Sequence, residues 1–75
     1  MEINTVVLED NIRYFILKEI ENEENRYVYL VNVDDAEDFC IRKIKEENGK
    51  EFLVGLDSEA EFEKLVLIFA KEING

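Results

Sequence analysis

The sequence predicts an α+β fold: an antiparallel β-meander of about four to five strands with one C-terminal α-helix packed on one face. Two observations predict it. Apolar side chains alternate in short segments up to Leu56, and from Glu59 onward they recur at helical spacing. A series of strands followed by a helix is typical of the α+β class.

The segment RYVYLVNV, residues 26–33, is the strongest strand candidate because almost every residue in it favours a pleated, half-buried conformation. One face would carry Tyr27, Tyr29, Val31 and Val33, and the other face Val28 and Leu30. A strand that is apolar on both faces needs neighbours along both edges. We therefore expect residues 26–33 to lie in the interior of the sheet.

Two strands are predicted before this central one. Residues 3–8 form a short first strand, and a polar turn follows at residues 9–11. Residues 12–20 form the second strand, in which Ile12, Tyr14, Ile16 and Ile20 share one parity and so one predicted face. The polar segment ENEEN, residues 21–25, is expected to be a hairpin loop that pairs residues 12–20 with residues 26–33.

Two further strands are predicted after residues 26–33. The acidic segment DDAED, residues 34–38, is a second connection, and residues 39–45 form a basic strand that carries Arg42, Lys43 and Lys45. Since opposite charges across a strand pair are stabilising, this strand is expected beside a segment that carries Glu. The Asn48-Gly49 pair supplies positive φ for a tight hairpin turn, with residues 52–56 as the last strand.

A helix is predicted over residues 59–73. Ser58 and Glu61 have capping-box spacing, acidic residues occupy the first turn, and Gly75 supplies a stop. Leu67 lies opposite the apolar stripe and Ile68 on its flank, so each is either simply exposed or part of a contact surface. The stripe predicted to dock on the sheet consists of Phe62, Leu65, Val66, Phe69, Ala70 and Ile73.

The length and net charge of the chain limit which classes of protein it can belong to. The 75 residues make one small acidic domain, residues 1–75, because a second core would leave too little apolar area for either. A net charge of −10 disfavours direct binding to nucleic acid or to an anionic membrane, and favours basic partners. The N-terminal segment has no signal-peptide pattern and no apolar run is long enough to span a bilayer, so a soluble cytoplasmic protein is expected.

The residues that usually carry catalysis are scarce. The chain has no histidine, its single cysteine, Cys40, lies in the middle of a predicted apolar strand, and its single serine, Ser58, is explained as a helix cap. No glycine spacing matches a phosphate-binding loop. We therefore expect a non-enzymatic protein with no catalytic residue, no metal site and no cofactor.

The acidic segments have two readings. They lack the spacing of a calcium-binding loop, so solvated acidic loops are the simpler interpretation. Alternatively, their carboxylates present charge spaced like phosphates and contact a basic partner. The candidate contact residues are Asp34, Asp35, Glu37, Asp38, Glu21, Glu23, Glu24, Leu67 and Ile68.

Several motifs, taken in order, resemble a known family. The sequence runs FxLxxIE, an acidic gap, RYVYLV, an acidic loop, FLVGL and an acidic helix start EAEFEKL over residues 12–73. This order is similar to that of the small acidic YrzB-like proteins of bacteria, a domain of unknown function. The resemblance supports the predicted fold, but it implies no activity and no site residues.

Two functions follow as hypotheses. The first is a non-enzymatic protein that acts through contact with an unknown protein partner, for which a basic protein is one candidate. The alternative is an acidic inhibitor, of phage or mobile-element type, that mimics nucleic acid and blocks a basic nucleic-acid-binding protein. The sequence leaves open whether the chain forms a homodimer.

Overall fold

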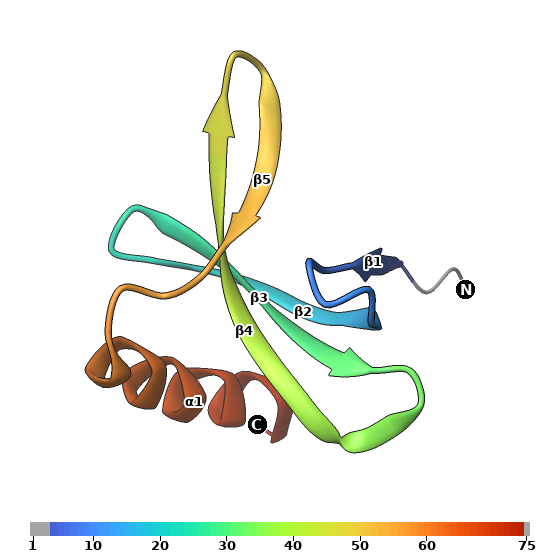
Figure 1. The fold of residues 1–75 in the computed structure, drawn as a ribbon. Coiled ribbons are helices and arrows are strands. Elements are labelled where there is room, and N and C mark those ends of the chain that lie inside the picture. Colours follow the sequence, from blue (N-terminus) through green and yellow to red (C-terminus); the bar gives the residue numbers. More distant parts are fainter. Residues whose placement is uncertain (1–3, 75) are drawn as a thin grey trace.

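The computed structural model describes residues 4–74, so Ile3 and Gly75, which the sequence analysis assigned to the first strand and to the helix stop, lie outside the described residues. Figure 1 shows a five-stranded sheet with one helix across it. The elements are β1 (Thr5–Val7), β2 (Arg13–Asn22), β3 (Asn25–Asn32), β4 (Asp35–Glu47), β5 (Lys50–Val54) and α1 (Glu59–Asn74).

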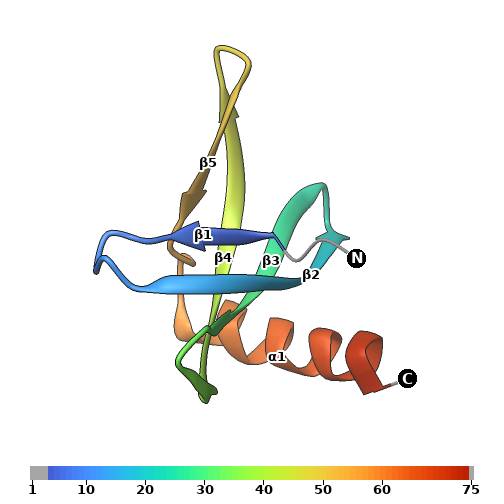
Figure 2. The same ribbon diagram turned by 90° about the vertical axis from the view of Figure 1, so that its right-hand side faces the viewer.

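The sheet is an antiparallel meander, as predicted, and its strand order, which the sequence left open, is β1-β2-β3-β4-β5. Strand β3 occupies the middle of this order, which confirms the interior position expected for residues 26–33. The helix lies below β2 in Figure 2, with β1 on the other side of that strand. The α+β prediction, with a C-terminal helix on the sheet, is therefore confirmed.

Strand β4 is the longest element of the sheet, with 13 residues, and it serves two partners. Residues 39–44 pair with β3, whereas residues 43–47 pair with β5. The two pairings overlap only at Lys43 and Ile44. The β4–β5 hairpin therefore projects beyond the rest of the sheet, away from the helix (Figure 1).

A β-bulge in β2 changes which residues share a face. Ile16 lies opposite Leu30 but Lys18 lies opposite Tyr29, so Leu17 is an extra residue in the ladder. One extra residue inverts the alternation of every side chain after it. The predicted single face for Ile12, Tyr14, Ile16 and Ile20 is therefore wrong: Tyr14 and Ile16 face one core and Ile20 faces the other.

The protein has a hydrophobic core on each side of β3. The helix-side core consists of Tyr27, Ile41, Leu65 and Phe69. The second core contains only sheet and turn residues, because the curled sheet brings residues of β1 and β5 against its own inner face. This inner core is formed by Leu8, Tyr14, Val28 and Leu30, with Val6, Ile16, Cys40, Ile44 and Leu53 packed against it.

The β2–β3 and β4–β5 hairpins each have a tight two-residue turn with positive φ. Asn48 and Gly49 have φ values of 52° and 79°, which confirms the predicted Asn-Gly turn. The predicted five-residue loop at residues 21–25 is wrong, because Asn22 pairs with Asn25 and only Glu23 and Glu24 form the turn. These two glutamates have φ values of 52° and 70°, a conformation that costs a non-glycine residue about 1–2 kcal/mol.

The acidic connection predicted at residues 34–38 is also shorter than expected. Strand β4 begins at Asp35, so Asp34 lies in the turn while Asp35, Glu37 and Asp38 belong to the start of the strand. A register shift after Val31 accommodates these extra strand residues. All four carboxylates are exposed, since this end of β4 extends beyond the cores.

The helix begins as its capping pattern predicts but is rotated about its axis. Leu65 and Phe69 are fully buried, and Phe62 and Val66 pack beside them, as expected. Ala70 and Ile73 are exposed instead of docked, whereas Ile68 packs against the helix-side core. The rotation follows from β3 and β4, because Tyr27, Tyr29 and Ile41 offer apolar contacts to the Leu65 and Ile68 side of the helix.

Candidate binding site between the β2–β3 hairpin and the helix

Lys43 is the one buried charged side chain among residues 4–73, with an exposed fraction of 6%. The alternation of β4 places Lys43 on the same face as Ile41, toward the helix. A buried ammonium group must be paired, since an unpaired charge in a core is strongly unfavourable. The carboxylates that pair with it come from the start of the helix.

Two carboxylates bind the Lys43 ammonium group. Its Nζ donates to Asp57 Oδ2 at 2.8 Å and lies 3.3 Å from Glu61 Oε2. The Tyr27 hydroxyl donates to the same Oε2 of Glu61 at 2.9 Å, and the Tyr27 ring centroid lies 5.9 Å from Nζ. This polar cluster of Tyr27, Lys43, Asp57 and Glu61 therefore joins β3, β4 and the helix start.

The capping box positions Glu61 for these contacts. Ser58 Oγ accepts a hydrogen bond from the Glu61 N–H at 3.1 Å, and Glu61 Oε1 accepts one from the Asp57 N–H at 2.8 Å. One oxygen of Glu61 therefore closes the helix N-terminus, while the other oxygen binds Tyr27 and Lys43.

The shifts in pKa agree with a permanently charged cluster. The hydrogen bond from the Asp57 amide lowers the pKa of Glu61, and the hydrogen bond from Lys43 lowers that of Asp57. The hydrogen bond to Asp57 raises the pKa of Lys43, and burial raises that of Tyr27. At neutral pH both carboxylates and the ammonium group are ionised and the phenol is neutral.

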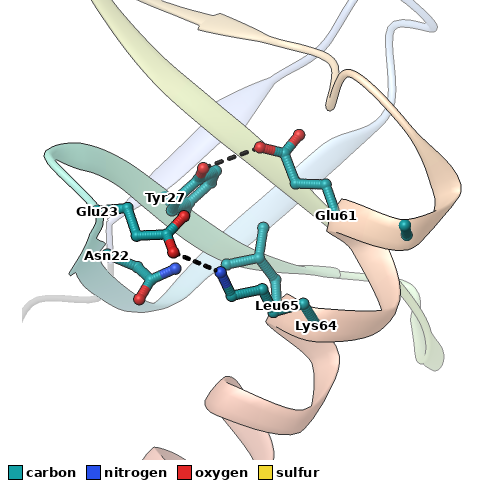
Figure 3. A pocket seen from close by; sticks show the side chains of 7 residues that line it. Asn22, Glu23, Tyr27, Glu61, Lys64 and Leu65 are labelled. Carbon is teal, nitrogen blue, oxygen red and sulfur yellow. Dashed lines mark hydrogen bonds and ion pairs between the residues drawn. The ribbon is translucent and has the colours of Figure 1, made fainter.

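A hollow of about 250 Å³ lies beside this cluster, between the β2–β3 hairpin and the helix (Figure 3). Across it Lys64 Nζ and Glu23 Oε1 form an ion pair at 2.9 Å. Figure 3 shows the Glu23 and Lys64 side chains reaching toward each other from the hairpin and the helix. The lining residues are Asn22, Glu23, Tyr27, Ala60, Glu61, Lys64 and Leu65.

The side chains around the hollow are suited to binding. Glu61 accepts three hydrogen bonds or ion contacts, from Asp57, Tyr27 and Lys43, so most of its acceptor positions are filled. Glu23 is exposed and has a single ion-pair partner, which leaves acceptor positions on its carboxylate. The lining contains no serine, threonine or cysteine, and its one hydroxyl, that of Tyr27, donates to Glu61 and has a pKa raised by burial.

The predicted acidic contact residues fall into two groups at opposite ends of β3. Glu21, Glu23 and Glu24 lie at the β2–β3 hairpin, whereas the residues from Asp34 to Asp38 lie at the β3–β4 connection. Eight strand residues separate the groups, which is roughly 25 Å. Of all these carboxylates, only that of Glu23 lines the hollow.

The two apolar contact candidates do not form one surface. Leu67 is 68% exposed on the outer side of the helix, as predicted. Ile68 is only partly exposed and packs against the helix-side core. No group of three or more metal-ligating side chains occurs within the part of the chain that the structure describes.

Sequence reasoning missed most of the hollow. The sequence analysis assigned four of its lining residues to a loop, a strand or a helix but to no site: Asn22, Tyr27, Glu61 and Lys64. A usable signal was present in β4, where Lys43 shares parity with the apolar residues Phe39 and Ile41. A lysine at a core-facing position requires a carboxylate partner, and Glu61 of the capping box was the available one.

These features define a class of protein: a small acidic α+β domain in which a capped helix is joined to a curled meander by a buried ion cluster. The chain belongs to the family described as "Protein of unknown function (DUF1292)", whose model matches residues 9–73. No curated protein and no solved structure matches the chain. Among residues 4–74, no helix is both long and apolar enough to cross a membrane.

Proposed function

We propose that this chain is a non-enzymatic, cytoplasmic bacterial protein of the YrzB-like kind that acts by contact with a basic protein partner. The observation that carries the proposal is the excess of exposed, unneutralised carboxylates. Among the described residues, ion pairs engage five carboxylates, and the chain has nineteen acidic residues in all. A surface of this kind attracts a partner of opposite charge.

The chemistry of the side chains supports a binding role over catalysis. The polar cluster of Tyr27, Lys43, Asp57 and Glu61 is internally paired and fastens the helix to the sheet. Cys40 packs against the inner core, and burial raises its pKa, which disfavours the nucleophilic thiolate. Ser58 is occupied as a helix cap.

The test is affinity purification of the tagged chain from a bacterial extract, washed at increasing salt and read by mass spectrometry. We expect one basic protein that is lost as salt screens the contact. Its binding should then be reproduced with the purified partner. Recovery of no partner, or of one that resists salt, would contradict an electrostatic contact.

A second candidate function is the nucleic-acid mimic. It is favoured by the end of the sheet where the β1–β2 and β3–β4 turns lie together, because the acidic residues there have no ion-pair partner among residues 4–74. Tyr14 lies near both groups: burial raises its pKa most, the hydrogen bond to Asp10 in the β1–β2 turn raises it further, and Asp38 at the start of β4 adds to the effect. The acidic end consists of Glu9, Asp10, Asp34, Asp35, Glu37 and Asp38.

Two matched variants separate the candidates. The first changes Asp34, Asp35 and Asp38 to Asn and Glu37 to Gln, and the second changes Glu21, Glu23 and Glu24 to Gln. Mimicry predicts that the partner is a nucleic-acid-binding protein, that nucleic acid competes with the chain for it, and that the first variant loses inhibition. Equal binding by the first variant and the unmodified chain would exclude a role for the acidic end.

A further inference from the structure

We propose that the hollow between the β2–β3 hairpin and α1 receives a basic side chain, an arginine or a lysine, from the partner protein. The inference rests on the proposed function, because it assigns the site of contact within that function. Its anchor is the Glu23 carboxylate, and Lys64 of the chain itself occupies the anchor when no partner is bound.

The first argument is the composition of the hollow. A volume of about 250 Å³ is large enough for the end of one long side chain but small for a cofactor. Two carboxylates, Glu23 and Glu61, and the amide of Asn22 line it, while Ala60 and Leu65 supply apolar contact for the methylene groups of an incoming side chain. Such a lining suits a cation on an aliphatic stem.

The second argument is the position of Lys64. Its Nζ lies 2.9 Å from Glu23 Oε1, and both side chains are substantially exposed, at 49% and 72%. An exposed ion pair contributes little to stability, so breaking it costs little. The ion pair therefore shows that Glu23 can bind an ammonium group, and a basic group of the partner can displace Lys64 at little cost.

The third argument is electrostatic. The β2–β3 hairpin carries Glu21, Glu23 and Glu24, and the facing helix start carries Asp57 and Glu61, both with lowered pKa values. Three cations lie near these groups: Arg26, opposite Glu21 and paired with Glu19 and Glu51, Lys43, paired within the polar cluster, and Lys64. Carboxylates therefore outnumber cations around the hollow, which favours an incoming positive charge.

The fourth argument is the backbone of the turn. Glu23 and Glu24 both have positive φ, where asparagine and glycine are the favoured residues. Glutamate at these positions costs conformational energy, and strained backbone is concentrated at functional sites. At Glu23 the side chain enters the hollow, whereas Glu24 lines no part of it.

The experiment is an NMR titration of the ¹⁵N-labelled full chain with N-acetyl-arginine methylamide and with N-acetyl-lysine methylamide. The uncharged citrulline analogue is the control. We expect saturable amide shifts confined to residues around the hollow, such as Glu23, Tyr27 and Leu65, with either basic probe and none with citrulline. Absent or unsaturable shifts, or shifts spread over the acidic end of the sheet, would overturn the inference.

Two pairs of matched variants sharpen the titration. Glu23→Gln should weaken binding by about two- to fivefold, whereas Glu24→Gln in the same turn should change it much less. Lys64→Gln should strengthen binding by about two- to fivefold, because it removes the internal competitor, whereas Lys71→Gln makes the same charge change elsewhere on the helix. Equal effects within either pair would mean that the probe responds only to the net charge of the protein, and would overturn the assignment of the hollow as the binding site.

The same variants separate this inference from the proposed function. If a basic partner is recovered by affinity purification and Glu23→Gln leaves its affinity unchanged, the hollow is not the contact site while the binding function stands. If arginine binds the hollow of the purified chain but no basic partner exists, the proposed function fails while the site remains.

Discussion

The Tyr27 hydroxyl donates a hydrogen bond to Glu61 Oε2 across 2.9 Å, although the two residues are 34 positions apart in the sequence. Because Lys43 Nζ lies 3.3 Å from the same oxygen, one carboxylate oxygen joins two strands to the helix. The helix start is thereby held against β3 and β4, and its orientation over the sheet is defined. Unfolding free energies and their pH dependence test this arrangement.

Glu61→Gln should lower the free energy of unfolding by about 1–2 kcal/mol, because it removes the charge from hydrogen bonds with Lys43 and Tyr27. Glu63→Gln, an exposed position on the same helix, should change it by less than about 0.5 kcal/mol. Urea unfolding followed by circular dichroism measures both. In the double variant with Lys43→Met, the two effects should be less than additive, and full additivity would refute the coupling.

The contribution of Glu61 should depend on pH. Its pKa is lowered below its ordinary value of 4.5 in the folded chain, so its stabilising effect is present above pH 4.5 and is lost as the pH falls through the lowered value. The difference in unfolding free energy between the unmodified chain and Glu61→Gln should therefore be constant from neutral pH down to about pH 4.5 and should shrink as the pH falls further. A difference independent of pH would show that Glu61 acts through packing instead.

Glu24→Gly should stabilise the fold by about 1 kcal/mol, because glycine adopts the positive φ of 70° at this turn without strain. Conversely, Gly49→Ala should destabilise the fold by about 1 kcal/mol, because Gly49 has a φ of 79°, which alanine adopts only with strain. No atom lies within 4 Å of the added Cβ, so backbone strain is the sole expected cause.

Gly55→Ala is the control for the glycine series. Nothing lies within 4 Å of its added Cβ, and its φ is outside the left-handed region, so the change should be neutral or slightly stabilising. Thermal unfolding of the three variants measures the series. An equal loss at Gly49 and Gly55 would show that the turn conformation is not the cause.

Leu65 and Leu67 provide a test of the helix rotation. Leu65→Ala should cost about 2–4 kcal/mol because Leu65 is fully buried, whereas Leu67→Ala should fall within about 0.5 kcal/mol of the unmodified chain. Ile68→Ala should also be destabilising because Ile68 packs against the helix-side core, while Ala70→Ser should have little effect. A larger loss of unfolding free energy at Ala70 than at Ile68 would instead support the apolar stripe predicted from the sequence.

Tyr14 should titrate at an unusually high pH. Burial and its hydrogen bond to Asp10 raise its pKa from 10.0 to about 12. Asp10→Asn should lower this value only in part, because burial is the larger cause. Ultraviolet difference spectroscopy during alkaline titration measures the phenolate. A return to 10.0 in Asp10→Asn would mean that burial contributes nothing.

Local patterns predicted the elements of this fold well. Alternation identified the strands, the Asn48-Gly49 pair identified one turn, and Ser58 with Glu61 identified the helix start, because each signal lies within a few residues. A hairpin at residues 21–25 was predicted, but its tight two-residue turn at Glu23 and Glu24 was not, since neither residue favours positive φ. It forms because the flanking strands pair as far as Asn22 and Asn25.

The candidate site could not be predicted because it depends on tertiary contacts. Glu23 was a candidate contact residue, but only the docked helix brings Lys64 to it. In the same way, Lys43 was placed on the correct strand, while its partners Asp57 and Glu61 depend on where the chain leaves β5. The sequence contains the signals for each segment, and packing decides which of them meet.

The extra residue Leu17 also limits how the length of this chain can change during evolution. Deletion of its codon would restore strict alternation in β2, and Ile20 would then point into the inner core instead of toward the helix. A gap or an insertion between Ile16 and Ile20 is therefore disruptive, whereas the tip of the β4–β5 hairpin, beyond the Ile44–Leu53 pair that contacts the inner core, can change length by paired residues. The register of β2 thus determines which of its residues enter each core.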